Sequence, residues 1–240
     1  MEVKANAIVI KTVDYKDNDK ILTLYSLEYG KITATIKGVK KSGAKLKFAS
    51  EPFSFCEYIL AVKGGRYVVI NATHIDTFYN LRLNLKKYYA VALLGEFANK
   101  LLEEEIKDEY FFDLLINGVK NICYEDNEYY YLSKFLIDAI QCLGYGITDY
   151  NCFGCGEDIK GRVFFSFKNA EFSCLECRQE GYNEIMPITY EAFKEVINGI
   201  APKSEGVEKL IRFLVYYVKY KTETNLKSAE ALYSLFVESA

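Results

Sequence analysis

The chain has 240 residues, half of them hydrophobic, which is enough for one large packed domain or two modest ones. Its formal net charge of -3 excludes the strongly basic overall composition typical of many nucleic-acid-binding proteins, but the charge is uneven. Residues 1–80 carry 12 basic and 8 acidic side chains, a net of +4, whereas residues 81–240 carry 18 and 25, a net of -7. This asymmetry predicts two domains with different partners.

The beginning of the chain shows no basic segment followed by an apolar run, so we expect no signal peptide. Apolar stretches fall short of the roughly 18 residues that a membrane span needs, so we expect no membrane association. Seven cysteines, an odd number, indicate reduced thiols and a cytoplasmic protein.

Residues 3–76 alternate between apolar and polar side chains, as β-strands do. We expect strands at 5–11, 20–27, 31–39, 52–62 and 66–75, most of them linked by short turns. Five short strands in about eighty residues fit a small closed barrel, and the five-stranded OB-fold is the leading candidate. The sequence therefore predicts an OB-fold nucleic-acid-binding domain over 1–80.

A basic segment connects the third and fourth expected strands. From 29 to 50 there are six lysines and no acid: Lys31, Lys37, Lys40, Lys41, Lys45 and Lys47. A flexible basic loop on a small barrel suits binding to a phosphate backbone, and we add Arg66 of the fifth strand to this candidate surface. A solvated loop that keeps the barrel soluble explains the charge equally well.

From about residue 81 the apolar period becomes helical. We expect helices at 83–105, 109–122, 128–143, 190–197, 206–221 and 228–237, with Thr189 as the N-cap of the fourth. These predict an all-helical domain over 81–240.

Four cysteines interrupt the helical part as two C-x-x-C pairs, Cys152 with Cys155 and Cys174 with Cys177. Two such pairs with fifteen to twenty residues between them are typical of a four-cysteine zinc site. Short strands at 162–168 and 171–173 would form a hairpin between the pairs. The sequence thus predicts a zinc-ribbon-like insertion at 150–180 holding one Zn²⁺ whose role is structural, since four thiolates leave no open coordination position.

The sequence contains no recognisable catalytic set. Its single histidine, His74, ends the fifth expected strand without an evident partner, and carboxylates fall in exposed runs. We expect neither an enzyme nor a small-molecule substrate.

Taken together, these parts resemble the RecO family of bacterial recombination mediators. The resemblance rests on the order and spacing of segments along nearly the whole chain: Ala7–Thr12, Asp17–Tyr25, Tyr29–Ile32, Lys37–Lys41, Leu143–Gly146, Cys152–Gly156, Phe165–Phe167, Cys174–Cys177 and Leu226–Ser228.

The resemblance implies an OB domain, a helical domain and an embedded zinc finger. It also implies a protein of the nucleoid that binds single- and double-stranded DNA and anneals complementary strands. With RecR, such proteins help load RecA on DNA coated by single-strand binding protein (SSB), whose acidic C-terminal tail they recognise. Lys37, Lys40 and Lys41 fall on the family's basic segment.

For the SSB tail, a basic and aromatic helix surface is a candidate site: Lys209, Arg212, Phe213, Tyr216 and Lys219. An ordinary amphipathic helix explains the same pattern. A second hypothesis for the whole chain is an OB-fold and zinc scaffold that binds RNA or protein partners without annealing activity.

Overall fold

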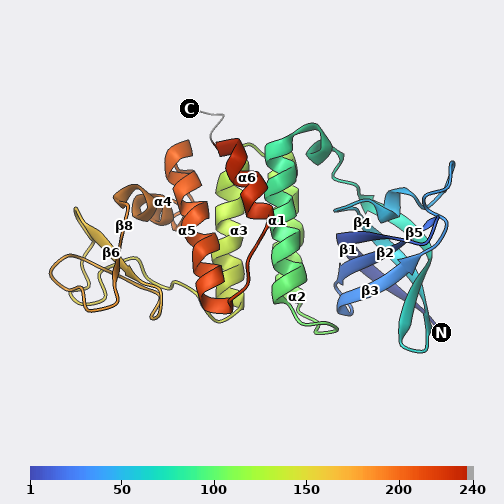
Figure 1. The fold of residues 1–240 in the computed structure, drawn as a ribbon, viewed down its shortest axis with the longest axis horizontal. Coiled ribbons are helices and arrows are strands. Elements are labelled where there is room, and N and C mark those ends of the chain that lie inside the picture. The colour runs from blue at the N-terminus through green and yellow to red at the C-terminus, as the bar shows by residue number, and fades with distance from the viewer. Residues whose placement is uncertain (237–240) are drawn as a thin grey trace. The chain divides into compact units, whose positions relative to one another are not determined.

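The computed structural model describes residues 1–236, which divide into two compact units, Met1–Tyr124 and the chain from Glu125 onward. The predicted fold class is confirmed: a closed five-stranded barrel comes first in the chain, and helices follow (Figure 1). The first unit contains the barrel together with two long helices. The domain boundary near residue 80 stays a prediction. In the described part of the chain, we find no helix with the length and apolar character needed to cross a bilayer.

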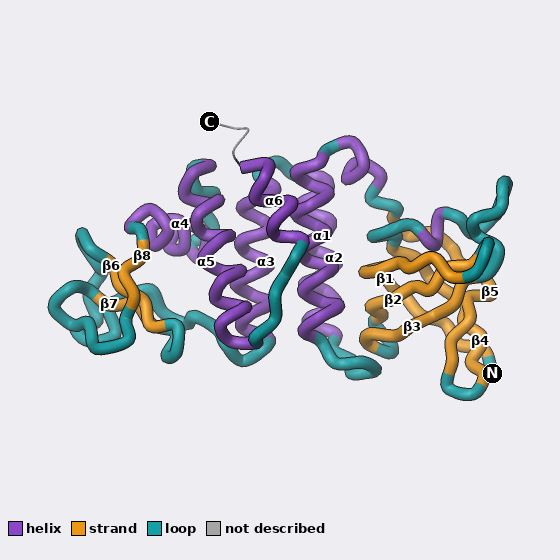
Figure 2. The backbone as a smooth tube through the Cα atoms, viewed as in Figure 1, coloured by secondary structure: helices purple, strands orange, loops and turns teal. Residues whose placement is uncertain are grey.

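The barrel strands are drawn in orange in Figure 2: β1 (Glu2–Tyr15), β2 (Asp19–Ser26), β3 (Gly30–Ile36), β4 (Phe55–Lys63) and β5 (Arg66–Asp76). Around the barrel their order is β1-β2-β3-β5-β4. β3 and β5 run parallel, and the other neighbours are antiparallel. The parallel pair closes the barrel, which agrees with the predicted OB-like architecture.

The barrel core follows from the alternation in the sequence. Small and branched apolar side chains point inward: Ala5, Ala7, Val9, Leu22, Leu24, Ile32, Ala34 and Ile36. A bulge between Val9 and Lys11 interrupts β1, and Ile8 and Ile10 on its other face are also buried. Helix α1 (Leu85–Leu101) packs on β1 there, where a Cβ on Gly95 would lie 3.3 Å from the Ile10 carbonyl oxygen.

Two short 3-10 helices and α2 complete the first unit: η1 (Phe48–Ser50), η2 (Tyr79–Leu83) and α2 (Glu109–Tyr124). Helix α1 ends four residues earlier than the 83–105 pattern predicted, because Leu102 adopts an extended conformation. The chain after it then follows β3: the Glu105 N–H donates to the Lys31 carbonyl at 2.9 Å. Gly30 has φ +63° there, and a Cβ on it would lie only 2.0 Å from the Ile106 carbonyl oxygen.

Up to residue 236, the second unit contains four helices and a small sheet: α3 (Glu128–Cys142), β6 (Val163–Ser166), β7 (Glu171–Ser173), β8 (Asn183–Ile185), α4 (Pro187–Ile197), α5 (Ser204–Thr222) and α6 (Ser228–Phe236). Val237, the last residue of the expected sixth helix, lies outside the described residues. Helix α5 packs against both α3 and α4. The inserted segment after α3 carries the sheet.

The sheet is antiparallel, in the order β7-β6-β8, and packs on the helices through aromatic rings. Phe165 of β6 contacts Phe213 of α5, with ring centroids 5.0 Å apart. Phe172 of β7 contacts Tyr190 and Phe193 of α4 at 5.2 and 5.4 Å. The inserted segment therefore shares its apolar core with α4 and α5.

Two local predictions for this unit were wrong. Helix α4 begins at Pro187 and not at Tyr190, because a proline fits the first helical turn, where no N–H partner is needed. Thr189 is consequently a buried helical residue and not the N-cap. β8 was not predicted, since three residues are too short for an alternating pattern to stand out.

Candidate nucleic-acid interface and metal centre

The basic loop, residues 37–47, is tied at its beginning to the turn between β1 and β2. The Gly38 N–H donates to Asp19 Oδ1 at 2.8 Å, and the Lys40 N–H donates to the Asn18 carbonyl at 3.1 Å. The Lys40 ammonium also pairs with Asp14 Oδ2 at 2.7 Å, and this hydrogen bond holds the pKa of Asp14 below its ordinary 3.8. The predicted flexible loop is thus anchored to the barrel where it starts.

The far end of the basic loop is anchored by packing. Leu46 and Phe48 contact the barrel core, and the buried Tyr58 hydroxyl donates to the Ala49 carbonyl at 2.7 Å. Between the two anchors the lysine side chains face solvent: Lys37, Lys40, Lys41, Lys45 and Lys47 are exposed. The structure therefore brings five of the six predicted lysines together on one fixed, exposed loop.

Lys31 has a different environment. Its side chain is only 8 % exposed, and its ammonium donates to the carbonyls of Asn99, at 2.9 Å, and Leu102. These are carbonyls at the end of α1, which lack intrahelical partners and favour a nearby cation. Such burial counts against a phosphate contact, and we leave Lys31 out of the DNA surface proposed below.

Arg66 is exposed but stands apart from the basic loop. In the antiparallel register of β4 and β5 it lies opposite Lys63, next to the turn between these strands. The next residue, Tyr67, pairs with Ala34, so Arg66 lies nearer the middle of β3 than the end that leads into the basic loop. The candidate surface therefore has two separate basic elements.

Sequence reasoning missed Lys16. This exposed residue lies in the β1–β2 turn and lines an open polar hollow of about 360 Å³ together with Lys37, Gly38 and Lys41. Asp17, Asn18 and Asp19, which follow Lys16 in the same segment, also line the hollow. A charge count could not find Lys16, because only the pairing of the turn with the basic loop brings it near the other lysines.

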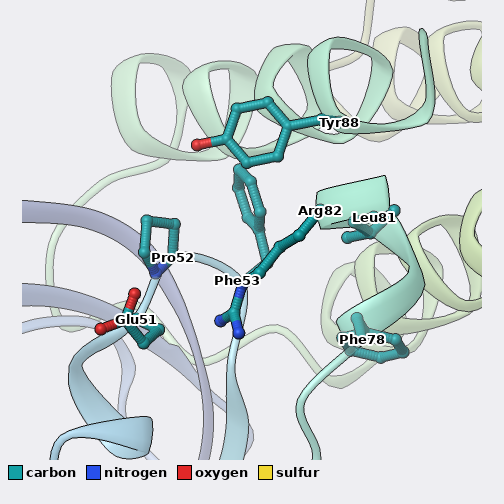
Figure 3. A pocket seen from close by; sticks show the side chains of 7 residues that line it. All are labelled: Glu51, Pro52, Phe53, Phe78, Leu81, Arg82 and Tyr88. Carbon is teal, nitrogen blue, oxygen red and sulfur yellow. The ribbon is translucent and has the colours of Figure 1, made fainter. Parts of the chain in front are cut away.

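An apolar cavity of about 280 Å³ lies in the same unit (Figure 3). Phe53 and Phe78 line it and have φ values of +65° and +44°, which large side chains rarely adopt. The Phe53 ring points toward Tyr88 of α1, with centroids 5.6 Å apart. Glu51 and Arg82 are the charged residues of the lining, so its chemistry differs from that of the lysine-lined hollow and we assign it no part of the DNA surface.

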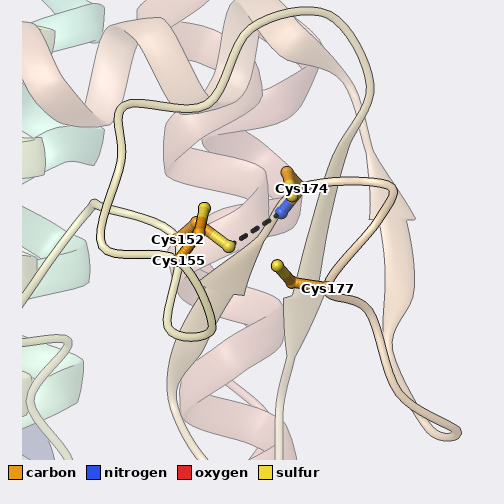
Figure 4. A group of neighbouring side chains, drawn as sticks. All are labelled: Cys152, Cys155, Cys174 and Cys177. Carbon is orange, nitrogen blue, oxygen red and sulfur yellow. Dashed lines mark hydrogen bonds between the residues drawn. The ribbon is translucent and has the colours of Figure 1, made fainter.

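The four predicted cysteines come together in the second unit (Figure 4). Cys152 and Cys155 come from the loop after α3, and Cys174 and Cys177 follow β7. Their Sγ atoms all lie within 4.8 Å of one another. A tetrahedral zinc site with bonds of about 2.3 Å separates its sulfur atoms by about 3.8 Å, so the cluster has suitable dimensions to hold a metal ion.

The backbone around the cluster fits two metal-binding knuckles. The Gly156 N–H donates to the Cys152 carbonyl at 2.8 Å, which closes the first turn. The Cys174 N–H donates to Cys152 Sγ at 3.4 Å, drawn as a dashed line in Figure 4. A Cβ on Gly154 would lie 2.7 Å from Cys177 Cβ, so this close approach requires glycine.

The thiols differ in acidity. Burial opposes ionisation of Cys152, but N–H groups of Cys174, Cys155 and Gly154 donate to its sulfur and lower its pKa to about 6. Hydrogen bonding to the Cys174 and Cys152 sulfurs raises the pKa of Cys177 to about 12. A single thiolate is favoured, and its charge opposes a second. A bound dication would offset two of the four negative charges and so favour ionisation of all four thiols.

The five predicted partner residues lie along α5, but they are not equally available. Tyr216 and Lys219 are exposed, whereas Phe213 is buried against the sheet. The Arg212 guanidinium lies over the Tyr233 ring of α6 at 4.2 Å.

The fifth, Lys209, pairs with Glu205 at 3.1 Å and is half-buried. The exposed Tyr216 contacts Phe167 just after β6, with centroids 5.0 Å apart. An exposed aromatic and basic strip therefore runs along α5.

Comparisons with known proteins cover both units. The family model described as Recombination protein O N terminal matches residues 1–78, and the one described as Recombination protein O C terminal matches residues 82–230. These descriptions concern DNA recombination and indicate no catalytic enzyme family.

Three curated relatives each bear the name DNA repair protein RecO. The protein of Thermoanaerobacter sp. (strain X514) is 25 % identical over 245 residues, which cover 97 % of this chain and 98 % of the relative. The Pelotomaculum thermopropionicum protein is 29 % identical over 94 % of this chain and 91 % of its own. The Caldicellulosiruptor saccharolyticus protein is 28 % identical over 76 % and 75 %.

Proposed function

Because the chain belongs to the RecO family of DNA repair and recombination proteins, we propose that it is a non-enzymatic mediator of recombinational repair in the cytoplasm. It binds single- and double-stranded DNA and anneals complementary strands. With RecR, it helps load RecA on SSB-coated DNA. The observation that supports DNA binding is the basic loop, which carries exposed lysines and is anchored at both of its ends to an OB-like barrel.

Charge supports placing DNA on the barrel. The first 80 residues carry a net +4 and the remainder -7, so phosphates are attracted to the barrel and repelled by much of the chain that follows it. Each phosphate that a lysine neutralises releases counterions, which makes the affinity salt-dependent. Lys37, Lys41, Lys45 and Lys47 are the main contacts, with Lys40 shared between Asp14 and DNA.

The test of DNA binding is a titration of labelled oligo-dT at several salt concentrations, with wild type and with the Lys37/Lys40/Lys41→Ala variant. We expect weaker binding and a log–log salt slope that is shallower by about 2 for three lost contacts on a single strand. Arg66→Ala tests the second basic element of the candidate surface separately, since it removes a cation elsewhere on the barrel. Equal affinity and slope for the triple variant and wild type would refute the placement of DNA on the basic loop.

Annealing and loading need a partner surface as well as DNA. The exposed strip on α5, with Tyr216 and Lys219 at its centre and Arg212 beside it, offers cations and an aromatic ring to the acidic, apolar SSB tail. The test is annealing of SSB-coated oligonucleotides with intact and tail-less SSB. Tyr216→Ala should remove the benefit of the tail and leave annealing of naked DNA unchanged. If Tyr216→Ala still anneals DNA coated with intact SSB better than DNA coated with tail-less SSB, the tail binds elsewhere.

We further propose that the four cysteines hold one structural Zn²⁺ per chain. The ion would supply charge compensation for the thiolates and stability for the second unit. Protein purified without chelator should contain about one zinc per chain, and Cys155→Ser should lose it and melt at lower temperature. Stoichiometric zinc in that variant would contradict the assignment.

A further inference from the structure

The hollow lined by Lys16, Lys37 and Lys41 is formed by two segments far apart in the sequence. One is the β1–β2 turn, and the other is the start of the basic loop after β3. The hydrogen bonds from the Gly38 and Lys40 N–H groups to Asp19 and Asn18 fix the two segments together. The floor of the hollow is therefore a defined part of the fold.

The lysines of the hollow are available to a ligand. Among residues 1–236, neither Lys16, Lys37 nor Lys41 takes part in an ion pair, whereas the adjacent Lys40 turns to Asp14. The Lys16 ammonium lies 5.2 Å from the centre of the exposed Tyr15 ring, a contact that leaves its charge without a counterion. Three lysines that form no ion pair in the described residues thus line one hollow.

The acids of the hollow do not cancel this charge. Asp19 accepts the Gly38 N–H, so one of its oxygens is already engaged. Asp17 is exposed and opposes an anion, which leaves an excess of one positive charge among the lining residues. Lysine ammonium groups are suitable point charges for a phosphate, and Gly38 leaves the approach open, because a Cβ there would meet nothing within 4 Å.

We propose that this hollow is a seat for one backbone phosphate of a DNA strand, contacted by Lys16, Lys37 and Lys41. The inference rests on the proposed function and adds to it a contact residue, Lys16, and a fixed point of the strand. An acidic peptide carries the same sign of charge. DNA is favoured because Lys45 and Lys47 continue the exposed cations along the basic loop, which suits a polymer with a regular repeat of phosphates.

The test compares Lys16→Gln with Lys63→Gln in salt titrations of labelled oligo-dT. Both lysines are exposed and lie at hairpin turns of the same barrel, so each change removes one charge and leaves the core intact. Lys16→Gln should weaken binding about tenfold at low salt and make the slope shallower by about 0.7. Lys63→Gln should change neither. Lys16→Arg should restore binding, and Asp17→Asn should strengthen it.

The outcomes separate the two claims. If Lys16→Gln binds oligo-dT like wild type while the Lys37/Lys40/Lys41→Ala variant loses binding, the phosphate seat is refuted and DNA binding by the basic loop stands. If wild type itself shows no salt-dependent binding, the proposed function fails. If Lys16→Gln weakens the binding of a labelled poly-glutamate peptide but not the binding of DNA, the hollow is a peptide-binding site and the inference is overturned.

Discussion

The change Lys31→Met tests whether this buried lysine stabilises the end of α1. Methionine retains an unbranched apolar stem but has no ammonium to donate to the carbonyls of Asn99 and Leu102. A hydrogen bond to a charged group contributes about 1.5–3 kcal/mol, and a cation at a helix C-terminus adds about 0.3–1 kcal/mol. Because the side chain is only 8 % exposed, water cannot replace the lost donor, and we expect a cost of about 2–4 kcal/mol.

Thermal melting followed by circular dichroism measures this cost, which corresponds to a fall in Tm of about 6–12 °C for a chain of this size. The same variant, assayed below its melting range, should bind oligo-dT with the affinity and salt slope of wild type. Lys37→Met is the matched control, with the opposite pattern: unchanged Tm and weaker DNA binding. If Lys31→Met leaves Tm unchanged and weakens DNA binding, Lys31 is a DNA contact and the interpretation of its burial is wrong.

Two further predictions concern the same unit. Gly30→Ala should destabilise the protein by about 2 kcal/mol more than Gly64→Ala, because both residues have positive φ but only a Cβ at Gly30 meets a backbone oxygen, at 2.0 Å. Urea unfolding measures the free energy of unfolding of both variants. Equal losses would show that the backbone near Ile106 moves to make room for the new Cβ. Lys40→Ala should raise the pKa of Asp14 back toward 3.8, as followed by NMR titration of its carboxyl carbon. A carboxyl group whose pKa is lowered in the folded state stabilises the fold above its unfolded pKa, and this stabilisation is lost as the pH falls through the folded pKa. The variant should therefore be less stable than wild type at neutral pH, and the two should become equally stable in acid. An Asp14 pKa that does not move would mean that Lys40 is not its main partner.

The barrel was predictable because its strands alternate. Inward residues such as Leu22 and Leu24 or Ile32 and Ala34 recur at every second position, and this period survives in the structure. The cysteine cluster was predictable for a similar reason, since ligand spacing within each C-x-x-C pair is a local property. Features encoded over a few neighbouring residues can be derived from one sequence.

The environments of individual lysines were not predictable in this way. Lys31 lies near the start of β3 and Lys37 directly follows its end, yet Lys31 is buried at the end of α1 and Lys37 is exposed. The difference arises from contacts with residues 68 and 71 positions later, which no local pattern encodes. Lys16 was missed for a related reason, because the residues that line the hollow with it come from a separate loop.

Aromatic contacts between the inserted sheet and α5 connect the segment that carries the cysteine cluster to the helix that carries the proposed partner strip. Phe165 packs on Phe213 and Tyr217 at 5.0 and 5.7 Å, and β7, which pairs with β6, leads directly into Cys174. A ligand that stabilises one side of this shared core favours the folded form of the other, and such coupling acts equally in both directions. On the proposed roles of the strip on α5 and of the cysteine cluster, we expect their occupancies to be thermodynamically linked, so that a tail peptide that binds α5 slows the removal of metal by a chelator.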